Sequence, residues 1–195
     1  MKVVVIKYNA GNIRSVSFAL ERLNIAFTIT DDKEAITTAD KVIFPGVGEA
    51  STTMKYLKER KLDEVIRNLK QPVLGICLGM QLMCRHSEEN DTQCLGIFDE
   101  TVKLFNPTLD MKVPHMGWNQ LKFTNDWLDP SLESQYAYFV HSYYVPINAT
   151  TSATTEYLNQ FSAAMRKGNF YAVQFHPEKS AAVGEKVIKC FLNHS

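Results

Sequence analysis

The chain lacks net charge, long apolar runs and paired cysteines. Lys and Arg together number 21, as do Asp and Glu, so nothing supports a nucleic-acid-binding or polybasic membrane surface. No apolar run approaches the roughly 20 residues of a membrane span. The apolar stretch at residues 3–6 is followed by Lys7 and is too short for a signal-peptide core, so we expect a first buried strand there.

The four cysteines, Cys77, Cys84, Cys94 and Cys190, show neither a C-x-x-C pair nor the spacing of metal ligands. A chain of 195 residues can bury a core without disulfides, so these thiols fit a reducing, cytoplasmic location. The sequence also lacks internal repeats, low-complexity tracts and linkers rich in Pro, Gly or Ser. We therefore expect one domain spanning residues 1–195.

The first half of the chain alternates short apolar runs with amphipathic segments. Val16, Leu20 and Leu23 recur at helical spacing, whereas residues 73–76 have the length and composition of a fully buried parallel strand. Strands that alternate with helices predict a mostly parallel, doubly wound α/β sheet. We expect strands at residues 2–6, 25–28, 41–44 and 73–76, and helices at residues 13–23, 50–59, 62–69 and 78–84.

Beyond residue 88 the pattern changes to β segments joined by turns. The segment Arg166-Lys-Gly-Asn169 is a hairpin signal between two apolar runs, so this half is expected to be antiparallel or mixed. The polar, threonine-rich residues 149–155 are interpreted as a surface loop. We expect strands at residues 96–105, 121–124, 136–145 and 162–174, and a closing helix at residues 186–192.

A cysteine bracketed by glycines follows the apolar run of residues 73–76. Gly75-Ile-Cys77-Leu-Gly79 has the spacing of the nucleophile elbow G-x-S-x-G, which places a reactive side chain on a tight turn between strand and helix. The helix N-terminus would favour a thiolate, and the Leu78 N–H would be free to bind an oxyanion. Cys77 is therefore a candidate nucleophile. The alternative is an ordinary buried cysteine in the core.

His176 and Glu178 flank a proline at the end of the last expected strand. Proline favours an extended backbone at the preceding residue, and positions i and i+2 of an extended chain share a face. A carboxylate on one imidazole nitrogen fixes the tautomer and leaves the other nitrogen for the nucleophile. Taken alone, Glu178 could instead cap the next helix. Together with Cys77, the set supplies a nucleophile, a base and an orienting acid.

The order and spacing of these residues resemble the class I glutamine amidotransferases. The resemblance runs from the first strand to the last helix and implies a three-layer, flavodoxin-like α/β domain. The matching motifs are Gly75-x-Cys77-x-Gly79-x-Gln81, His176-Pro-Glu178, and Pro45-Gly-Val-Gly48, which matches the family's oxyanion loop. Within the family, the segments most similar to glutaminase subunits of imidazole glycerol phosphate synthases are Gly11-Asn12-x-x-Ser15-Val16, Pro45-Gly-Val-Gly48, Pro114-His-Met-Gly-Trp-Asn119 and Tyr138-Phe-Val-His-Ser-Tyr-Tyr144.

The resemblance implies a reaction in which Cys77 attacks the side-chain amide of glutamine, His176 protonates the departing ammonia, and water hydrolyses a glutamyl thioester. The Leu78 N–H would supply one oxyanion donor, and the backbone of Val47 or Gly48 the other. Glycines on both sides of Val47 make a peptide flip inexpensive. We hypothesise that a partner controls the reaction by switching this loop between an incomplete and a complete oxyanion hole.

The resemblance also assigns the glutamine substrate to Gln81 and to the backbone around Ser142 and Tyr143. Gln81 lies one helical turn after Cys77, which suits a contact to the same ligand. Without the resemblance, an ordinary solvent-facing position on a helix is an equally favoured interpretation of Gln81.

A partner subunit is implied as well: a TIM-barrel cyclase that receives the ammonia and forms imidazole glycerol phosphate and an aminoimidazole carboxamide ribotide in histidine biosynthesis. A dry interface would protect ammonia from protonation by water. Edge packing is the alternative role for the candidate interface residues, and for Trp118 it is equally favoured. The candidates are Asn12, Met116, Trp118, Asn119 and Lys179.

We expect no cofactor and no metal, because His115 and His141 have no ligand partner at useful spacing and the chemistry needs no Lewis acid. His86 is expected at an exposed helix end. The chain has Lys7-Tyr-Asn-Ala-Gly-Asn12 where relatives begin D-Y-G-x-G-N, so its first strand-to-helix turn and the partner contacts there can differ. The alternatives are a glutaminase subunit of an anthranilate or aminodeoxychorismate synthase, or an inert flavodoxin-like scaffold.

Overall fold

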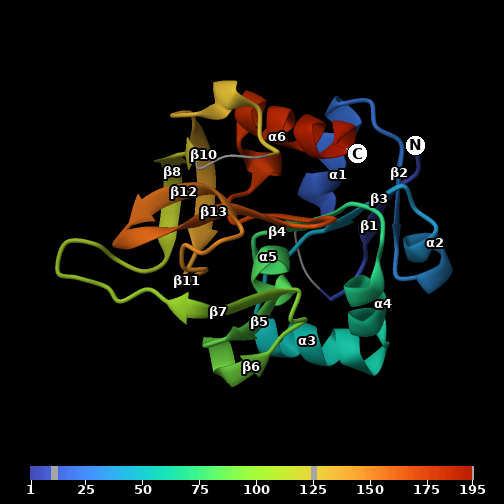
Figure 1. The fold of residues 1–195 in the computed structure, drawn as a ribbon, viewed down its shortest axis with the longest axis horizontal. Coiled ribbons are helices and arrows are strands. Elements are labelled where there is room, and N and C mark those ends of the chain that lie inside the picture. Colours follow the sequence, from blue (N-terminus) through green and yellow to red (C-terminus); the bar gives the residue numbers. More distant parts are fainter. Residues whose placement is uncertain (10–12, 124–126, 195) are drawn as a thin grey trace.

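The computed structural model describes residues 1–9, 13–123 and 127–194. The turn expected after the first strand lies partly outside the described residues. The interface candidate Asn12 lies outside them as well. Within the described part, helices lie on both sides of a central sheet, and further strands extend from one end of it (Figure 1).

The central sheet joins parallel strands from both ends of the chain. Its order is β2-β1-β3-β4-β14-β13-β12-β9; neighbours from β2 to β14 are parallel, and the remaining pairs are antiparallel. This order confirms the predicted mostly parallel α/β sheet with additional antiparallel strands. The strands are β1 Val3–Ile6, β2 Phe27–Thr30, β3 Lys41–Phe44, β4 Val73–Ile76, β9 Lys122–Phe123, β12 Thr151–Tyr157, β13 Asn159–Lys167 and β14 Phe170–Val173.

Shorter strands form two further sheets. Strands β10 and β8 pair as an antiparallel ribbon, and a separate sheet has the order β11-β7-β5-β6. Because β11 follows β10 after one residue, the chain passes from one sheet to the other at Ser142. The strands are β5 Cys84–Ser87, β6 Thr92–Gln93, β7 Phe98–Leu104, β8 His115–Gln120, β10 Tyr136–His141 and β11 Tyr143–Tyr144.

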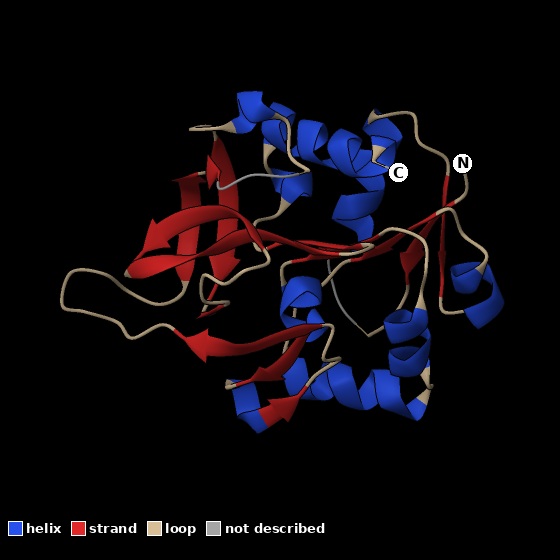
Figure 2. Ribbon diagram, in the orientation of Figure 1, coloured by secondary structure: helices blue, strands red, loops and turns tan. Residues whose placement is uncertain are grey.

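Alternating side chains of the buried strands divide the core into two layers. In β1, Val3 and Val5 pack with the buried faces of α1 and α6, whereas Val4 and Ile6 pack with α2 to α5 on the other face. Figure 2 shows the helices above and below the sheet. The helices are α1 Ile13–Arg22, α2 Lys33–Thr37, α3 Ala50–Glu59, α4 Leu62–Asn68, α5 Leu78–Met83 and α6 Ala181–Asn193, with 3₁₀ turns η1 Glu89–Asp91, η2 Pro130–Leu132 and η3 Pro177–Lys179.

Three predicted elements have the bounds that the sequence pattern gave them, namely β3, α3 and β4. The hairpin at residues 166–169 is also confirmed, because β13 and β14 pair antiparallel across it. The second strand lies two residues later than expected, and the closing helix begins five residues earlier.

Further predictions were wrong on both sides of residue 88. Residues 149–155 are not a surface loop, because β12 lies there, paired with β13 and β9, and Ser152 and Thr155 are buried. β-branched threonines fit a half-buried sheet despite their polarity. The helix expected at residues 78–84 ends at Met83, and the chain continues as β5. His86 is therefore a half-buried strand residue, with Nε2 2.8 Å from Asp91 Oδ1, and not an exposed helix end.

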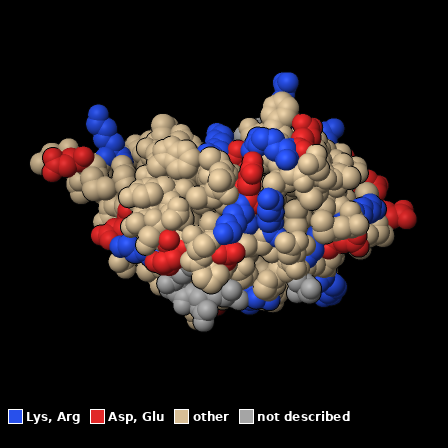
Figure 3. All heavy atoms as spheres, turned by 90° about the horizontal axis from the view of Figure 1, so that it is seen from above, with Lys and Arg blue, Asp and Glu red and all other residues tan. Residues whose placement is uncertain are grey.

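The surface carries no dominant charge of one sign in the view of Figure 3, where Lys and Arg groups are interspersed with Asp and Glu groups. Among the described residues, no helix is long and apolar enough to cross a membrane.

Candidate active site

Cys77 occupies the single residue between β4 and α5, as the sequence pattern predicted. Its backbone has φ 51° and ψ −106°, a strained conformation for a residue with a side chain. The flanking glycines are required by close packing. A Cβ on Gly79 would lie 2.1 Å from the Phe44 carbonyl oxygen, and one on Gly75 would lie 2.9 Å from Met83 Sδ. The turn therefore holds the thiol at the carboxyl edge of the sheet.

His176 and Glu178 form a buried pair next to this turn. His176 Nδ1 lies 2.7 Å from Glu178 Oε1, and both side chains are fully buried. The extended geometry assumed for the pair was wrong at Glu178, because residues Pro177–Lys179 form the turn η3. The His176 backbone is extended, and the turn brings Glu178 back onto the imidazole.

The strand order brings Cys77 and His176 together. Strands β4 and β14 are parallel neighbours, with Ile76 opposite Val173, so both chains leave the sheet at the same edge. Burial lowers the pKa of His176, but the negative charges of Cys77 and Glu178 outweigh it and raise that pKa well above its ordinary value. Of the two ring nitrogens, Nε2 is buried and has no conventional hydrogen-bond partner among the described residues. It is the nitrogen left to exchange a proton with the thiol.

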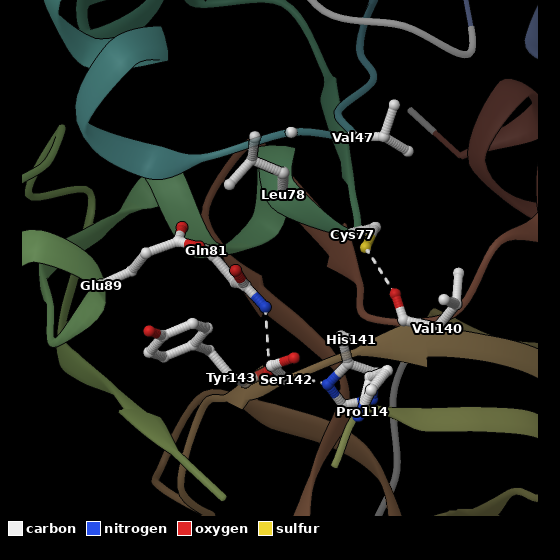
Figure 4. A pocket seen from close by; sticks show the side chains of 11 residues that line it. Val47, Cys77, Leu78, Gln81, Glu89, Pro114, Val140, His141, Ser142 and Tyr143 are labelled. Atoms are coloured by element: carbon white, nitrogen blue, oxygen red, sulfur yellow. Dashed lines mark hydrogen bonds between the residues drawn. The ribbon is translucent and has the colours of Figure 1, made fainter.

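A pocket of about 350 Å³ opens beside the thiol and is lined by residues of α5, η1, β10 and β11 and of the loops between elements (Figure 4). Its size suits a small amino acid, and its wall combines backbone groups with a few polar side chains. The lining residues are Val47, Gly48, Cys77, Leu78, Gln81, Glu89, Pro114, Val140, His141, Ser142 and Tyr143.

Val47 and Gly48, the residues of the expected oxyanion loop, lie in the pocket wall, but one expected donor is already engaged. The Leu78 N–H donates to the Gly46 carbonyl at 3.3 Å, so the expectation that it is free was wrong for this conformation. The cause is the close approach of the loop to α5, where Gly46 packs against Leu78 and Gly79. Gly48 has φ 129°, a conformation that glycine adopts readily and other residues avoid.

Gln81 is buried and points into the site, contrary to the solvent-facing alternative. Its Nε2 donates to the Tyr143 carbonyl at 2.9 Å and to Gln174 Oε1 at 3.0 Å. Gln174 in turn donates from Nε2 toward Cys77 Sγ at 3.6 Å. Through Gln174, Gln81 therefore connects the thiol to the wall formed by Ser142 and Tyr143. Figure 4 shows the Gln81 side of this connection.

Sequence reasoning missed Gln174 and Glu89. Gln174 directly precedes the segment that carries His176, and its amide character in an apolar strand was the available signal. Glu89 lies in η1, and no local pattern distinguishes it from its acidic neighbours. Its Oε2 accepts the Ala50 N–H at 2.7 Å, and burial raises its pKa. A carboxylate in the pocket wall can bind a cationic group of a ligand.

The other cysteines are poorly suited to nucleophilic chemistry. Burial raises the pKa of Cys84 and that of Cys190, and it raises the pKa of Cys94 to about 12. Among the described residues, no group of three His, Cys, Asp or Glu side chains is placed to hold a metal ion.

The described interface candidates lie on β8 and η3. Met116 and Trp118 are 63% and 53% exposed, and the Trp118 ring lies edge-on to Tyr138 with centroids 6.0 Å apart. Lys179 is exposed, with Nζ 6.0 Å from the centroid of the same tyrosine ring. Asn119 is half-buried and donates to the Glu156 carbonyl. Three of these side chains are therefore accessible to a partner.

A family model for glutamine amidotransferase class-I matches residues 5–194. The chain belongs to the class I glutamine amidotransferase family. Proteins named imidazole glycerol phosphate synthase subunit HisH resemble this amidotransferase closely. The one from Bacteroides thetaiotaomicron is 60% identical over 195 residues, covering 99% of this chain and 100% of the relative, and the one from Idiomarina loihiensis is 45% identical, covering 98% and 97%.

Solved structures agree with this amidotransferase fold at lower identity. A structure described as a glutamine amidotransferase has a TM-score of 0.75 at 20% identity and covers 97% of this chain and 96% of its own. A glutamine amidotransferase from Thermotoga maritima has a TM-score of 0.64 at 18% identity, covering 99% and 83%. At these identities the likeness establishes the fold alone.

Replacing Gly79 by alanine should disturb the thiol as well as the fold of this amidotransferase. The added methyl would collide with the Phe44 carbonyl. Overpacking of this kind costs about 1–3 kcal/mol, and relief of the collision must move the start of α5 and with it Cys77. We expect a lower urea midpoint and slower alkylation of Cys77.

The matched control is Gly168→Ala in the β13–β14 hairpin, where φ is 59° and a Cβ would meet nothing within 4 Å. It should lower stability through backbone strain alone and leave Cys77 alkylation unchanged. Equal alkylation rates in both variants would contradict the packing role given to Gly79.

Proposed function

We propose that this protein is the glutaminase subunit of an imidazole glycerol phosphate synthase and that residues 1–195 work as one glutamine amidotransferase domain. The observation that carries the proposal is the meeting of a strained Cys77 with a buried His176–Glu178 pair at one sheet edge. The names of close relatives support this synthase over one that makes anthranilate or aminodeoxychorismate.

In the proposed reaction, Glu178 accepts a hydrogen bond from His176 Nδ1–H, which leaves Nε2 to take the proton of the Cys77 thiol. The sulfur attacks the side-chain amide carbon of glutamine. As the C–N bond breaks, Nε2–H protonates the leaving nitrogen and ammonia departs. Water then attacks the glutamyl thioester, returning the proton to sulfur and releasing glutamate.

Substrate recognition is proposed from the pocket wall. The Glu89 carboxylate would pair with the α-ammonium group of glutamine. Gln81 and the backbone around Ser142 and Tyr143 would hold the rest of the amino acid next to the thiol. The cavity at this site accommodates a molecule of that size.

We propose that the resting conformation of the oxyanion loop leaves the oxyanion hole without its full set of N–H donors. With the Leu78 N–H donating to Gly46, the donor is unavailable to a tetrahedral intermediate. A change of the loop at Val47 and Gly48 would release Leu78 and present a second N–H. One oxyanion donor contributes roughly 10²–10³ in rate, so the two loop states would differ strongly in activity.

The proposed partner is a TIM-barrel cyclase subunit that receives ammonia through the surface carrying Met116, Trp118, Asn119 and Lys179, with Asn12 as a further candidate. Exposed aromatic and sulfur-containing side chains suit such an interface. The free thiols of the chain support a cytoplasmic location.

Replacing Cys77 by alanine should abolish glutamine-dependent synthesis but retain synthesis driven by added ammonium salts, because only ammonia release needs the thiol. Loss of a nucleophile reduces kcat by roughly 10⁴–10⁶-fold. The measurement is product formation by the complex with each nitrogen source. Cys190→Ala, which removes a half-buried thiol, is the control and should retain both activities. If both activities fall together in Cys77→Ala, the cysteine is structural and the scaffold alternative gains support.

Replacing Glu89 by glutamine should raise KM for glutamine by about 10- to 100-fold and change kcat little, because a charge-assisted contact to the substrate is lost. Glu88→Gln alters the neighbouring exposed carboxylate, which does not line the pocket, and serves as the control. A KM unchanged by Glu89→Gln would place the α-ammonium group elsewhere.

Replacing Gly48 by alanine should raise glutaminase activity in the absence of the cyclase. At φ 129° alanine is strained but meets no neighbour within 4 Å, so the resting loop loses stability relative to its alternative. Strain on the order of 1–2 kcal/mol shifts the loop equilibrium by about 5- to 30-fold. The measurement is glutamate release with and without cyclase, with Gly168→Ala as the strain control. A stimulation factor that stays at the wild-type value would reject the loop switch.

A further inference from the structure

Two buried histidines that take no part in the proposed reaction contact each other across adjacent strands. His115 on β8 and His141 on β10 are cross-strand partners, and His115 Nδ1 lies 3.3 Å from His141 Nε2. They are only 3% and 6% exposed. At the two ends, His141 Nδ1 lies 2.6 Å from the Tyr143 carbonyl oxygen and His115 Nε2 lies 3.4 Å from Asn119 Nδ2.

The partners fix the direction of every hydrogen bond in this contact. The Tyr143 carbonyl can only accept, so His141 Nδ1 carries the proton and its Nε2 is the acceptor. His115 must then donate from Nδ1, and its Nε2 accepts from the Asn119 amide. Burial lowers the pKa of His141 to about 3 and that of His115 to about 4, so both rings are neutral and keep this tautomer.

The same carbonyl belongs to the network that reaches the thiol. The Tyr143 oxygen also accepts from Gln81 Nε2, and Gln81 donates to Gln174, whose Nε2 lies 3.6 Å from Cys77 Sγ. In Figure 4 the Gln81 amide and the His141 ring approach the segment that carries Ser142 and Tyr143 from different sides. A hydrogen-bonded path therefore extends from β8 to the nucleophile.

Strand β8 has two faces with different surroundings. Met116 and Trp118 project outward and are exposed, while the alternate positions His115 and Asn119 face His141 on the other side of the strand. Any molecule that binds the outer face acts on the backbone that also carries His115 and Asn119.

We propose that His115 and His141 are positioning residues, forming a hydrogen-bond relay that holds the Tyr143 carbonyl and makes the glutamine pocket respond to β8. The proposal rests on the proposed glutaminase function, because it names a regulatory contact of that site. When a partner shifts β8, the relay moves the carbonyl that anchors Gln81. The loop at Val47 and Gly48 approaches the pocket from another element, so the relay is a separate input to the site.

Packing is the competing explanation, since the His115 ring stacks between Phe139 and Tyr157 with centroids 5.1 and 4.1 Å away. His115→Phe keeps an aromatic ring there and removes the donor. His141→Phe removes the donor to Tyr143, whereas His141→Asn retains an N–H near the Nδ1 position. These substitutions separate hydrogen bonding from packing.

The first test measures KM and kcat for glutamine in the complex with the cyclase. We expect His141→Phe to raise KM by about 3- to 10-fold, the loss expected for one neutral hydrogen bond, and His141→Asn to recover most of it. His115→Phe should raise KM less than His141→Phe, because the Tyr143 contact remains. The double Phe variant should match His141→Phe alone, because the two rings act in series. His194→Phe, on the C-terminal side of α6, is the control.

The relay would be overturned if the KM increase of the double variant equalled the product of the increases of the two single variants. A wild-type KM in His141→Phe would also overturn it. Urea unfolding of each variant identifies any that fails to fold. If the wild-type complex releases no glutamate, the proposed glutaminase function fails instead. The relay is then tested by a measurement that does not depend on glutamine turnover.

That second test is ¹⁵N NMR of the histidine rings in the wild-type chain. We expect the Nδ1–H tautomer at His115 and His141, and a shift of the His141 resonances on addition of the cyclase that is absent in His115→Phe. A purely structural role would not make the His141 shift depend on His115. The opposite tautomer at either ring, or a shift of equal size in His115→Phe, would overturn the proposal.

Discussion

The parallel pairing of β4 with β14 is the constraint on which the site depends. These strands are separated by almost a hundred residues of sequence, yet Ile76 lies opposite Val173, so the chain turns at Cys77 and at His176 occur at one edge. A slip of one residue would reverse the faces of β14 and point Gln174 and His176 away from the thiol. The crossing of the chain that permits this pairing also places antiparallel β13 and β12 beside the parallel half.

The burial of His176 and Glu178 determines how the charges at this edge are paired. Glu178 and His176 are both fully buried, and an unpaired carboxylate there would be strongly unfavourable, so each group requires the other. The turn η3 provides the necessary geometry by bringing Glu178 back toward Nδ1. With Nδ1 engaged, the proton can move only at Nε2, which faces the sulfur side. The fold therefore sets the direction of proton transfer before substrate binds.

The sequence alone predicted the features that depend on local patterns. The buried strand before Cys77, the strained turn and the mostly parallel sheet all follow from apolar runs and glycine spacing. The threonine-rich strand β12 was missed because its polarity suits a loop, and burial between β13 and β9 is a property of the whole fold. Glu89 reaches the pocket wall only through tertiary packing, and no local pattern distinguishes it from its acidic neighbours. The engaged Leu78 N–H depends on how closely the Gly46 carbonyl approaches α5, which residue types do not encode.

The pocket wall joins groups of different origin, and this explains how its parts can be controlled separately. Cys77, His176 and Glu178 are fixed by the central sheet, where movement would disrupt the buried core. Gly48 lies on a loop, and the Tyr143 carbonyl lies where the chain passes from the β8–β10 ribbon to another sheet. These connections can shift without unpacking the core. In the proposed glutaminase, the reacting groups stay assembled while the proposed oxyanion donors and the substrate-binding wall change with the partner. Under this proposal, glutamine hydrolysis becomes productive only when the ammonia has an acceptor.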